Sequence, residues 1–254
     1  MAVVPAAHQA LQILRYLSSQ AGPVPAASIV RDLALPRSTV YHLLATLADD
    51  GFVTRLADEQ RYALGLAAYE LGTGYTRQAP LQRIARVPLA RLVDRVAHSA
   101  HLAVLHGREV VYVIEERAPG RPPLVTDVGV RLPAQLTASG RAMLAQLPAA
   151  QVRALYPDAA AFVLRTGAGP RSPSALRAQL VDVRRRGHAL EDGEVTAGFA
   201  SIASPVLDHS GHPVAGVAVT FPAAALPGPT RDRVAVLVER TAATITRRIG
   251  GQPA

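Results

Sequence analysis

Three short helical patterns that follow one another between residues 10 and 47 constrain the fold most. In each of them apolar residues recur at positions i, i+3, i+4 and i+7, which is the spacing of one apolar face on an α-helix. The three sets are Ala10, Ile13, Leu14 and Leu17; Ala26, Ile29, Val30 and Leu33; and Val40, Leu43, Leu44 and Leu47. Three such faces can enclose a small helical core.

The connections between these helices narrow the prediction. The second and third helices are joined only by residues 34–36, and so short a link forces them to cross steeply, as in a helix-turn-helix. Pro36 suits the first position of the third helix, and Gly51 suits the left-handed position after its end. Residues 52–55 and 61–64 are β-prone and flank a polar turn, which predicts a hairpin. The order helix, helix, helix, hairpin is that of a winged helix-turn-helix.

The polar residues that remain on the third helix gather in its first two turns. An α-helix fits the major groove of DNA, and side chains near the N-terminus of a recognition helix reach the base edges. On a small bundle these could be ordinary solvated residues, but the spacing, the Pro36 entry and the hairpin together favour DNA binding. The candidate contacts are Arg37, Ser38, Thr39, Tyr41 and His42 on the helix, and Arg55 and Arg61 on the hairpin.

Net charge is not what supports this prediction. The chain carries a formal charge of +8. Residues 1–80 contain six arginines and six acidic residues, whereas residues 81–254 contain 21 arginines and 13 acidic residues. We therefore expect the first region to bind DNA modestly by itself, and to gain affinity as a dimer on the two half-sites of a palindrome.

Composition excludes several classes of function. The chain has no cysteine and no lysine, since all 27 basic residues are arginine. This excludes disulfides, thiol nucleophiles, cysteine zinc sites, a Walker lysine and a Schiff-base lysine. A GC-rich genome explains the use of arginine. We expect no cofactor and no metal, and without a signal peptide or membrane span the protein should be cytosolic.

The remaining chain predicts a second, α+β domain. Residues 65–80 resemble a connector with a short helix that is broken at Gly72, Gly74 and Pro80. A helix is expected at 81–97, and the apolar run 110–114 should be a central, covered strand. Further strands are expected at 100–105, 109–116, 124–128, 188–191, 200–207 and 214–221, with helices at 137–147, 174–186 and 230–249. Strands and helices without strict alternation are typical of an α+β sheet.

Histidines and serines give weak support to an enzyme. His98 and His101 have a metal-site spacing, and His106 is near, but no third ligand or HExxH motif accompanies them. We interpret them as surface or strand-edge residues. The strained Gly-x-Ser-x-Gly elbow of a hydrolase is also absent. A metabolite-processing enzyme fused to a DNA-binding module stays as the alternative, and a ligand-free nucleoid binder is disfavoured by the neutral first region.

The segment Thr137-Ala138-Ser139-Gly140 is the clearest candidate for a ligand site. Thr137 is a good N-cap, and small residues after it leave the first N–H groups of a helix uncovered, which favours an anion. Simple capping by Thr137 explains the same residues, and spacing alone does not separate the two interpretations.

Several short segments occur in a specific order and spacing along the chain. They are residues 35–44 (LPRSTVYHLL), 50–53 (DGFV), 61–65 (RYALG), 128–129 (VG), 136–145 (LTASGRAMLA) and 202–206 (IASPV), followed by the C-terminal helix. On these segments the chain, from about Gln9 to Ile249, resembles the IclR family of bacterial transcriptional regulators. Gln9, Gln135 and Arg141 depart from the family pattern, which usually has Arg, His and Lys at these places.

The resemblance implies a winged helix-turn-helix domain at 1–75 and a GAF-like, profilin-like effector-binding domain at 76–254. It implies dimers through the first domain and tetramers through the second. N–H groups at one end of the cavity and Glu191 at the other predict a small organic acid with a hydroxyl opposite its carboxylate, whereas Asp192 and Glu194 are expected to be solvated. The implied effector-binding residues are Ala138, Ser139, Gly140, Glu191, Phe199, Ser201, Ala218 and Thr220.

Overall fold

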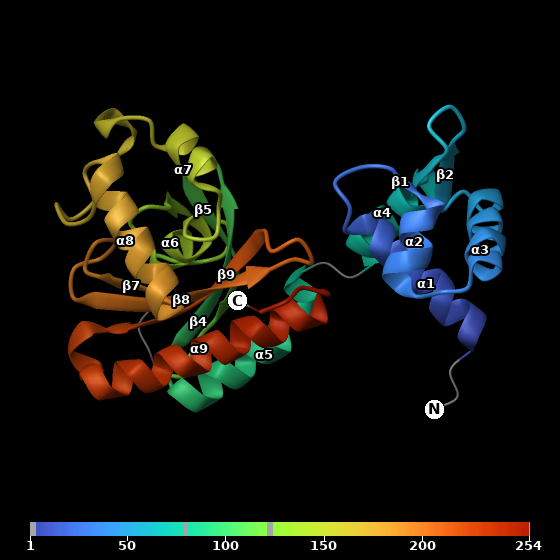
Figure 1. The fold of residues 1–254 in the computed structure, drawn as a ribbon. Coiled ribbons are helices and arrows are strands. Elements are labelled where there is room, and N and C mark those ends of the chain that lie inside the picture. The colour runs from blue at the N-terminus through green and yellow to red at the C-terminus, as the bar shows by residue number, and fades with distance from the viewer. Residues whose placement is uncertain (1–3, 79–80, 121–123, 254) are drawn as a thin grey trace. The chain divides into compact units, whose positions relative to one another are not determined.

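The computed structural model describes residues 4–78, 81–120 and 124–253, with residues 74–78 described by their backbone (Figure 1). The chain divides into two compact units, residues 1–80 and 81–254. The sequence predicted a division at 75/76. Each unit has its own core and is described by itself. No helix among the described residues combines the length and the apolar character that crossing a bilayer requires.

The first unit is built on the three predicted helices. Helices α1 (Pro5–Ser18), α2 (Ala26–Leu33) and α3 (Arg37–Asp49) pack around a core that contains Ile13, Ile29 and Leu44. Strands β2 (Val53–Leu56) and β3 (Arg61–Leu64) form the predicted hairpin. A short strand β1 (Val24–Pro25), which the sequence did not predict, pairs with β3. The winged helix-turn-helix is confirmed.

The turns around α3 differ in one detail from the expectation. Ala34 adopts a left-handed conformation with φ of 53°, and it ends α2 without glycine. Pro36 is the N-cap of α3 and not its first helical residue, so its fixed φ shapes the turn before the helix. Gly51 follows the end of α3 with φ of 74°, the conformation for which glycine was expected.

The connector is one continuous helix, contrary to the prediction. Helix α4 (Leu66–Gln78) runs through Gly72 and Gly74. A glycine inside a helix costs only about 1 kcal/mol relative to alanine, so it weakens the helix without ending it. Pro80 lies outside the described residues.

The second unit contains a six-stranded antiparallel sheet. Its strand order is β6-β5-β4-β9-β8-β7. The strands are β4 (Ser99–His106), β5 (Glu109–Glu116), β6 (Arg131–Pro133), β7 (Ala189–Asp192), β8 (Phe199–Leu207) and β9 (Pro213–Pro222). With its helices the unit is an α+β domain, as predicted.

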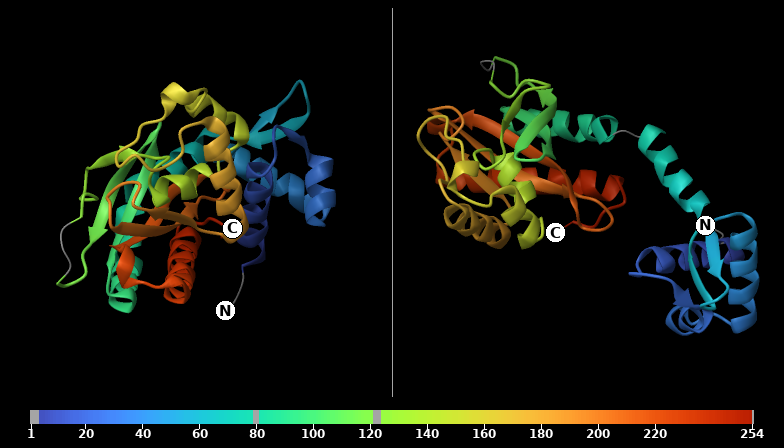
Figure 2. Two further views of the ribbon diagram at one scale, coloured as in Figure 1. Left: turned by 90° about the vertical axis from the view of Figure 1, so that its left-hand side faces the viewer. Right: turned by 90° about the horizontal axis from the view of Figure 1, so that it is seen from above.

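Helices cover both faces of this sheet (Figures 1 and 2). Helices α5 (Leu81–Val96) and α9 (Gly228–Arg248) lie side by side on one face, where they bury residues such as Leu89, Val217 and Val238. Helices α6 (Ala138–Leu144), α7 (Ala149–Leu155) and α8 (Pro173–Arg186) cover the other face. Residues on opposite faces of β4, β8 and β9 therefore contribute to two different cores.

Four segments of this unit differ from the sequence expectation. Residues 124–128 have β-prone side chains but are irregular. Strand β5 is not central, because it lies next to the short edge strand β6, which was not predicted. Helix α7 was also not predicted, since none of its residues is fully buried and it lacks a strong apolar face.

Candidate functional site

The N-terminal half of α3 presents most of its predicted DNA contacts to solvent. Arg37, Ser38, Tyr41 and His42 are exposed, while Thr39 is half-buried. The opposite side of the helix is held in the core by Val40, Leu44 and Leu47. The Arg37 guanidinium carbon lies 5.5 Å from the centre of the Tyr41 ring, a cation–π arrangement that keeps the arginine along the exposed face.

The two arginines of the hairpin have structural partners. Arg55 Nη2 donates to Gln60 Oε1 at 2.9 Å across the turn. Arg61 Nη1 donates to the carbonyl oxygen of Pro23 at 3.0 Å, which ties β3 to the segment before β1. Both side chains are exposed. They stabilise the hairpin, and a contact with DNA from either would have to compete with these bonds.

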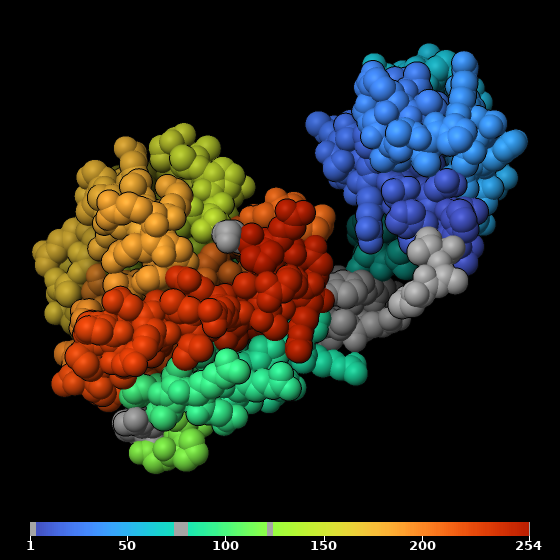
Figure 3. All heavy atoms as spheres, turned by 60° about the horizontal axis from the view of Figure 1, so that its bottom comes forward, coloured from blue at the N-terminus to red at the C-terminus, as the bar shows by residue number. Residues whose placement is uncertain are grey.

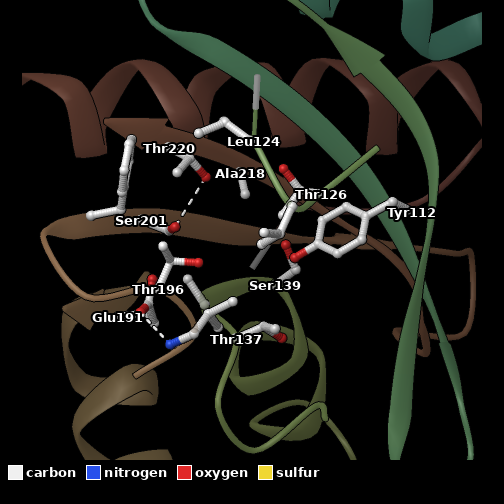
Figure 4. Close-up of a pocket in the computed structure, with 14 residues that line it drawn as sticks. Tyr112, Leu124, Thr126, Thr137, Ser139, Glu191, Thr196, Ser201, Ala218 and Thr220 are labelled. Atoms are coloured by element: carbon white, nitrogen blue, oxygen red, sulfur yellow. Dashed lines mark hydrogen bonds between the residues drawn. The ribbon is translucent and has the colours of Figure 1, made fainter. Parts of the chain in front are cut away.

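The second unit contains a cavity of about 70 Å³ between its sheet and the start of α6 (Figure 4). The sheet forms the floor of the cavity. Ser201 of β8 lies opposite Thr220 of β9, and Ala203 of β8 lies opposite Ala218 of β9, so side chains of the two strands are neighbours there. Of the eight predicted effector residues, all but Gly140 line the cavity. The lining residues are Tyr112, Leu124, Val125, Thr126, Thr137, Ala138, Ser139, Glu191, Val195, Thr196, Phe199, Ser201, Ala218 and Thr220.

Gly140 has a packing role. A Cβ atom at this position would collide with the carbonyl oxygen of Ala134. The Gly140 N–H is occupied by Thr137 Oγ1 at 2.9 Å, so the capping interpretation holds for this donor. Ala138 and Ser139 carry the first-turn N–H groups that Thr137 does not cap.

Ser139 is the least satisfied polar residue of the cavity. It is 1% exposed, and its Oγ has no hydrogen-bond partner among the residues that the structure describes. The hydroxyl of Tyr112 points toward the same place (Figure 4). Burial and the nearby Glu191 carboxyl raise the pKa of Tyr112, and its interaction with the Ser139 hydroxyl offsets only part of the rise, so the tyrosine hydroxyl stays protonated and can donate. A buried hydroxyl without a partner is costly, which makes this end of the cavity suited to a polar ligand.

Glu191 lies at the other end of the cavity and is partly engaged. Its Oε1 accepts from the backbone N–H groups of Glu194 at 2.8 Å and Val195 at 3.0 Å. Burial raises the pKa of Glu191, and these two bonds together with Ser201 and Arg141 offset only part of the rise. The carboxyl can therefore take up a proton more readily than an exposed glutamate.

We expect Glu191→Gln to stabilise the second unit at pH 7–8. The amide oxygen of glutamine can still accept both N–H groups, whereas the desolvated charge is removed. Because the folded-state pKa is raised, protonated Glu191 favours folding at low pH, and this contribution is lost as pH rises through the folded-state pKa. The gain in melting temperature should thus disappear near pH 4. Thermal unfolding across this range tests it. The control is Asp94→Asn, because Asp94 is exposed and its side chain has no ion pair among the described residues. A loss of stability at every pH in Glu191→Gln would contradict the prediction.

The acidic residues at the end of β7 and in the loop that follows are not all solvated. Glu194 is buried and forms an ion pair with Arg141 of α6, with Arg141 Nη1 at 3.1 Å from Glu194 Oε1. Asp192 is exposed as expected and pairs with Arg231 at 2.8 Å. The prediction failed for Glu194 because its partner lies 53 residues earlier in the chain.

His98 and His101 are buried, which corrects their interpretation as surface or strand-edge residues, whereas His106 is exposed at the end of β4. His101 Nε2 lies 2.8 Å from the hydroxyl of Thr126, a cavity residue, and 3.7 Å from Glu115 Oε1. Glu115 also pairs with Arg117, and both partners lower the pKa of its carboxyl. No group of three or more metal-ligating residues gathers within the described ranges.

The sequence did not identify half of the cavity. Tyr112 was hidden in an apolar strand, and Leu124, Val125 and Thr126 were assigned to a strand that does not form. Tyr112 carries a hydroxyl inside the otherwise apolar run 110–114, and this could have indicated that its side chain lines a cavity. Gln135 is a departure from the family pattern. Its Nε2 donates to the Val163 carbonyl oxygen at 2.9 Å, which connects the residues before α6 to the segment that contains Val163.

Comparison with known families agrees with both units. Residues 6–57 match the IclR helix-turn-helix domain. Residues 73–247 match the family described as bacterial transcriptional regulator IclR C-terminal. The chain belongs to the IclR family. It is therefore a DNA-binding transcriptional regulator with a C-terminal effector-binding domain, and the resemblance seen in the sequence is confirmed.

Relatives and solved structures of the IclR family span nearly the whole chain. The transcriptional regulator SauR of Cupriavidus necator is 32% identical over 223 residues, which cover 86% of each protein. An IclR regulator from Silicibacter has a similar fold, with a TM-score of 0.77, 24% identity, and coverage of 98% of this chain and 97% of its own. An IclR homologue from Microbacterium hydrocarbonoxydans, complexed with 4-hydroxybenzoate, has a TM-score of 0.59 and 22% identity over 96% of this chain and 99% of its own. The family is one of regulators, which decides against the enzyme alternative.

Proposed function

We propose that a small organic acid, bound in the cavity of the second unit, controls the binding of this regulator to its operator. The observation that supports this most is the Ser139 hydroxyl, which is buried at the cavity wall and has no hydrogen-bond partner among the described residues. A carboxylate accepts several hydrogen bonds at once, and bonds to a charged acceptor are stronger than neutral ones. The donors available to it are Ser139 Oγ, the Tyr112 hydroxyl and the uncapped N–H groups of Ala138 and Ser139.

The far end of the cavity favours a hydrogen-bond donor on the ligand. Glu191 accepts bonds when ionised, and it would repel a second carboxylate placed beside it. Ser201 Oγ and Thr220 Oγ1 lie 3.0 Å apart and provide hydroxyls between the two ends. Phe199 and Ala218 give the middle an apolar wall. This arrangement suits an acid with a short or aromatic body and a hydroxyl opposite the carboxylate.

Calorimetry with the full chain tests the proposal. The panel contains aromatic and short aliphatic acids, among them 4-hydroxybenzoate and benzoate, and each acid is compared with its neutral primary amide. We expect acids to bind more tightly than their amides. Ser139→Ala should weaken binding of the acids at least roughly tenfold, the order expected for one hydrogen bond to a charged group. Glu191→Gln should alter the preference between hydroxylated and simple acids.

A matched control separates this effect from general loss of packing. Ser204 is also a buried serine of the same domain, but it does not line the cavity. Ser204→Ala should leave acid binding unchanged. Tightest binding of an amide, a cation or a hydrocarbon, or normal acid binding by Ser139→Ala, would contradict the carboxylate assignment.

We further propose that the protein acts in the cytoplasm as a homodimer or tetramer on a palindromic operator. One recognition helix contacts only a short stretch of DNA. Helix-turn-helix dimers place two such helices on half-sites about one helical turn apart. The exposed apolar residues Leu66, Tyr69 and Leu71 on α4 offer a surface for such pairing. Light scattering at tens of micromolar, about the usual range for weak assemblies, should show dimers or tetramers, and a clean monomer would contradict this.

A further inference from the structure

A basic groove runs between α5 and α9 on the face of the sheet opposite the cavity. It has a volume of about 160 Å³. Figure 3 looks onto this face, where α9 (red) and α5 (green) lie side by side. Each helix contributes one stripe with the spacing of neighbouring turns. The lining residues are Pro88, Arg91, Leu92 and Arg95 of α5, and Leu237, Arg240, Thr241, Thr244 and Arg248 of α9.

The four arginines of this groove have no counter-charge among the residues that the structure describes. The guanidinium groups of Arg91, Arg95, Arg240 and Arg248 make no ion pair and no hydrogen bond there. No acidic residue lines the groove. The acidic residues of the two helices are elsewhere: Asp94 and Asp232 are exposed outside it, and Glu239 pairs with His188 at 2.9 Å.

This groove accounts for part of the charge that the sequence left unexplained. The surplus of arginine lies in residues 81–254 and not in the helix-turn-helix unit. Many acidic residues of the second unit are already paired, for example Glu116 with Arg86, Glu109 with Arg131 and Asp182 with Arg185. Four unpaired guanidinium groups around one hollow attract an anion with several charges, and guanidinium is well shaped for phosphate.

We propose that the α5–α9 groove binds the phosphate backbone of DNA that flanks the operator. The protein already binds DNA through its first unit, and α5 is the first helix of the second unit along the chain. A long duplex offers one negative charge per about 1.7 Å of its axis, so it can neutralise arginines on both helices at once. A second copy of this face is a poor partner, because pairing it with itself would oppose like charges.

The test measures how the DNA affinity of the full chain depends on salt. The probe is a 60-base-pair duplex of arbitrary sequence, since phosphate contacts are independent of sequence. Each lost phosphate contact should reduce the slope of log K against log salt concentration by about 0.9. We expect Arg91→Gln/Arg95→Gln to reduce the slope by at least that amount and to weaken binding at low salt. Arg91→Lys/Arg95→Lys should retain most of the slope, because the charge is kept.

A control with the same net charge decides whether the effect is local. Arg153 of α7 and Arg177 of α8 are exposed and line a different groove, and their side chains make no ion pair or hydrogen bond in the part of the chain that the structure describes. Arg153→Gln/Arg177→Gln should leave the slope unchanged. Equal effects of the two double variants would overturn the proposal, because they would show only long-range attraction.

Two further results would also overturn it. If pyrophosphate binds to the wild type by calorimetry and is lost in Arg91→Gln/Arg95→Gln while the DNA slope stays the same, the groove is a site for small anions. If the variant changes only the mass in light scattering, the groove belongs to an interface between copies of this chain.

Discussion

Replacing Arg141 with methionine is expected to lower the free energy of unfolding of the second unit by about 3–5 kcal/mol. The side chain of Arg141 is 4% exposed and that of its partner Glu194 is 12% exposed. The same guanidinium donates to Gln179 Oε1 at 3.2 Å and to the Leu136 carbonyl oxygen at 3.4 Å. Without it, the Glu194 carboxylate is left in a poorly solvated place with no cation. Urea denaturation followed by circular dichroism measures the change.

Two comparisons show whether the ion pair is responsible. Arg141→Met/Glu194→Leu should recover much of the loss, because no unpaired charge remains. Arg185→Met breaks an exposed pair, whose side chains are 74% and 45% exposed, and should cost no more than about 1 kcal/mol. An Arg141→Met loss as small as that of Arg185→Met would show that the pair does not hold α6 to the loop after β7.

Arg37→Ala is expected to weaken operator binding by about 1–3 kcal/mol if Arg37 contacts a guanine. The arginine is exposed at the start of α3, the end of a recognition helix from which side chains reach base edges. Ser38→Ala should weaken binding about equally on every sequence, because a serine hydroxyl bonds to phosphate. Fluorescence anisotropy at fixed salt measures both variants, on an operator sought in the DNA that flanks the gene and on a scrambled duplex.

Arg15→Ala is the matched control for the recognition helix. Arg15 is an exposed arginine of the same unit, but it lies in the last turn of α1. The substitution removes one positive charge without altering α3, so the loss of DNA affinity should be small and equal on both duplexes. Unchanged operator affinity in Arg37→Ala would show that α3 does not read DNA through this residue.

The first unit could be predicted from the sequence because its signals are local. The three apolar stripes, the short link at 34–36 and the glycine after α3 all lie within a few residues of the structure that they determine. The end of α4 was missed for a physical reason. A glycine inside a helix costs only about 1 kcal/mol relative to alanine, so Gly72 and Gly74 weaken the helix without ending it.

The cavity could be predicted only in part. Ser139 and Glu191, which lie at the two ends of the cavity, were found by resemblance, since both lie in segments of the family pattern. The residues that were missed depend on contacts between distant segments. Whether residues 124–128 form a strand depends on finding a free sheet edge, and the burial of Glu194 depends on Arg141. The role of Gly140 as a packing residue also required the position of Ala134, which no local pattern reveals.

Strand β9 is shared by the cavity and by the core beneath α5 and α9. Ala218 and Thr220 face the cavity, whereas Val217 and Val219 face the helices. Successive side chains of a strand point to opposite faces of the sheet, so they share one backbone. A displacement of side chains on either face therefore moves the same peptide units. A genetic screen for altered effector response should therefore recover substitutions of Val217 and Val219 as well as of cavity residues, although the side chains of these two valines face away from the cavity.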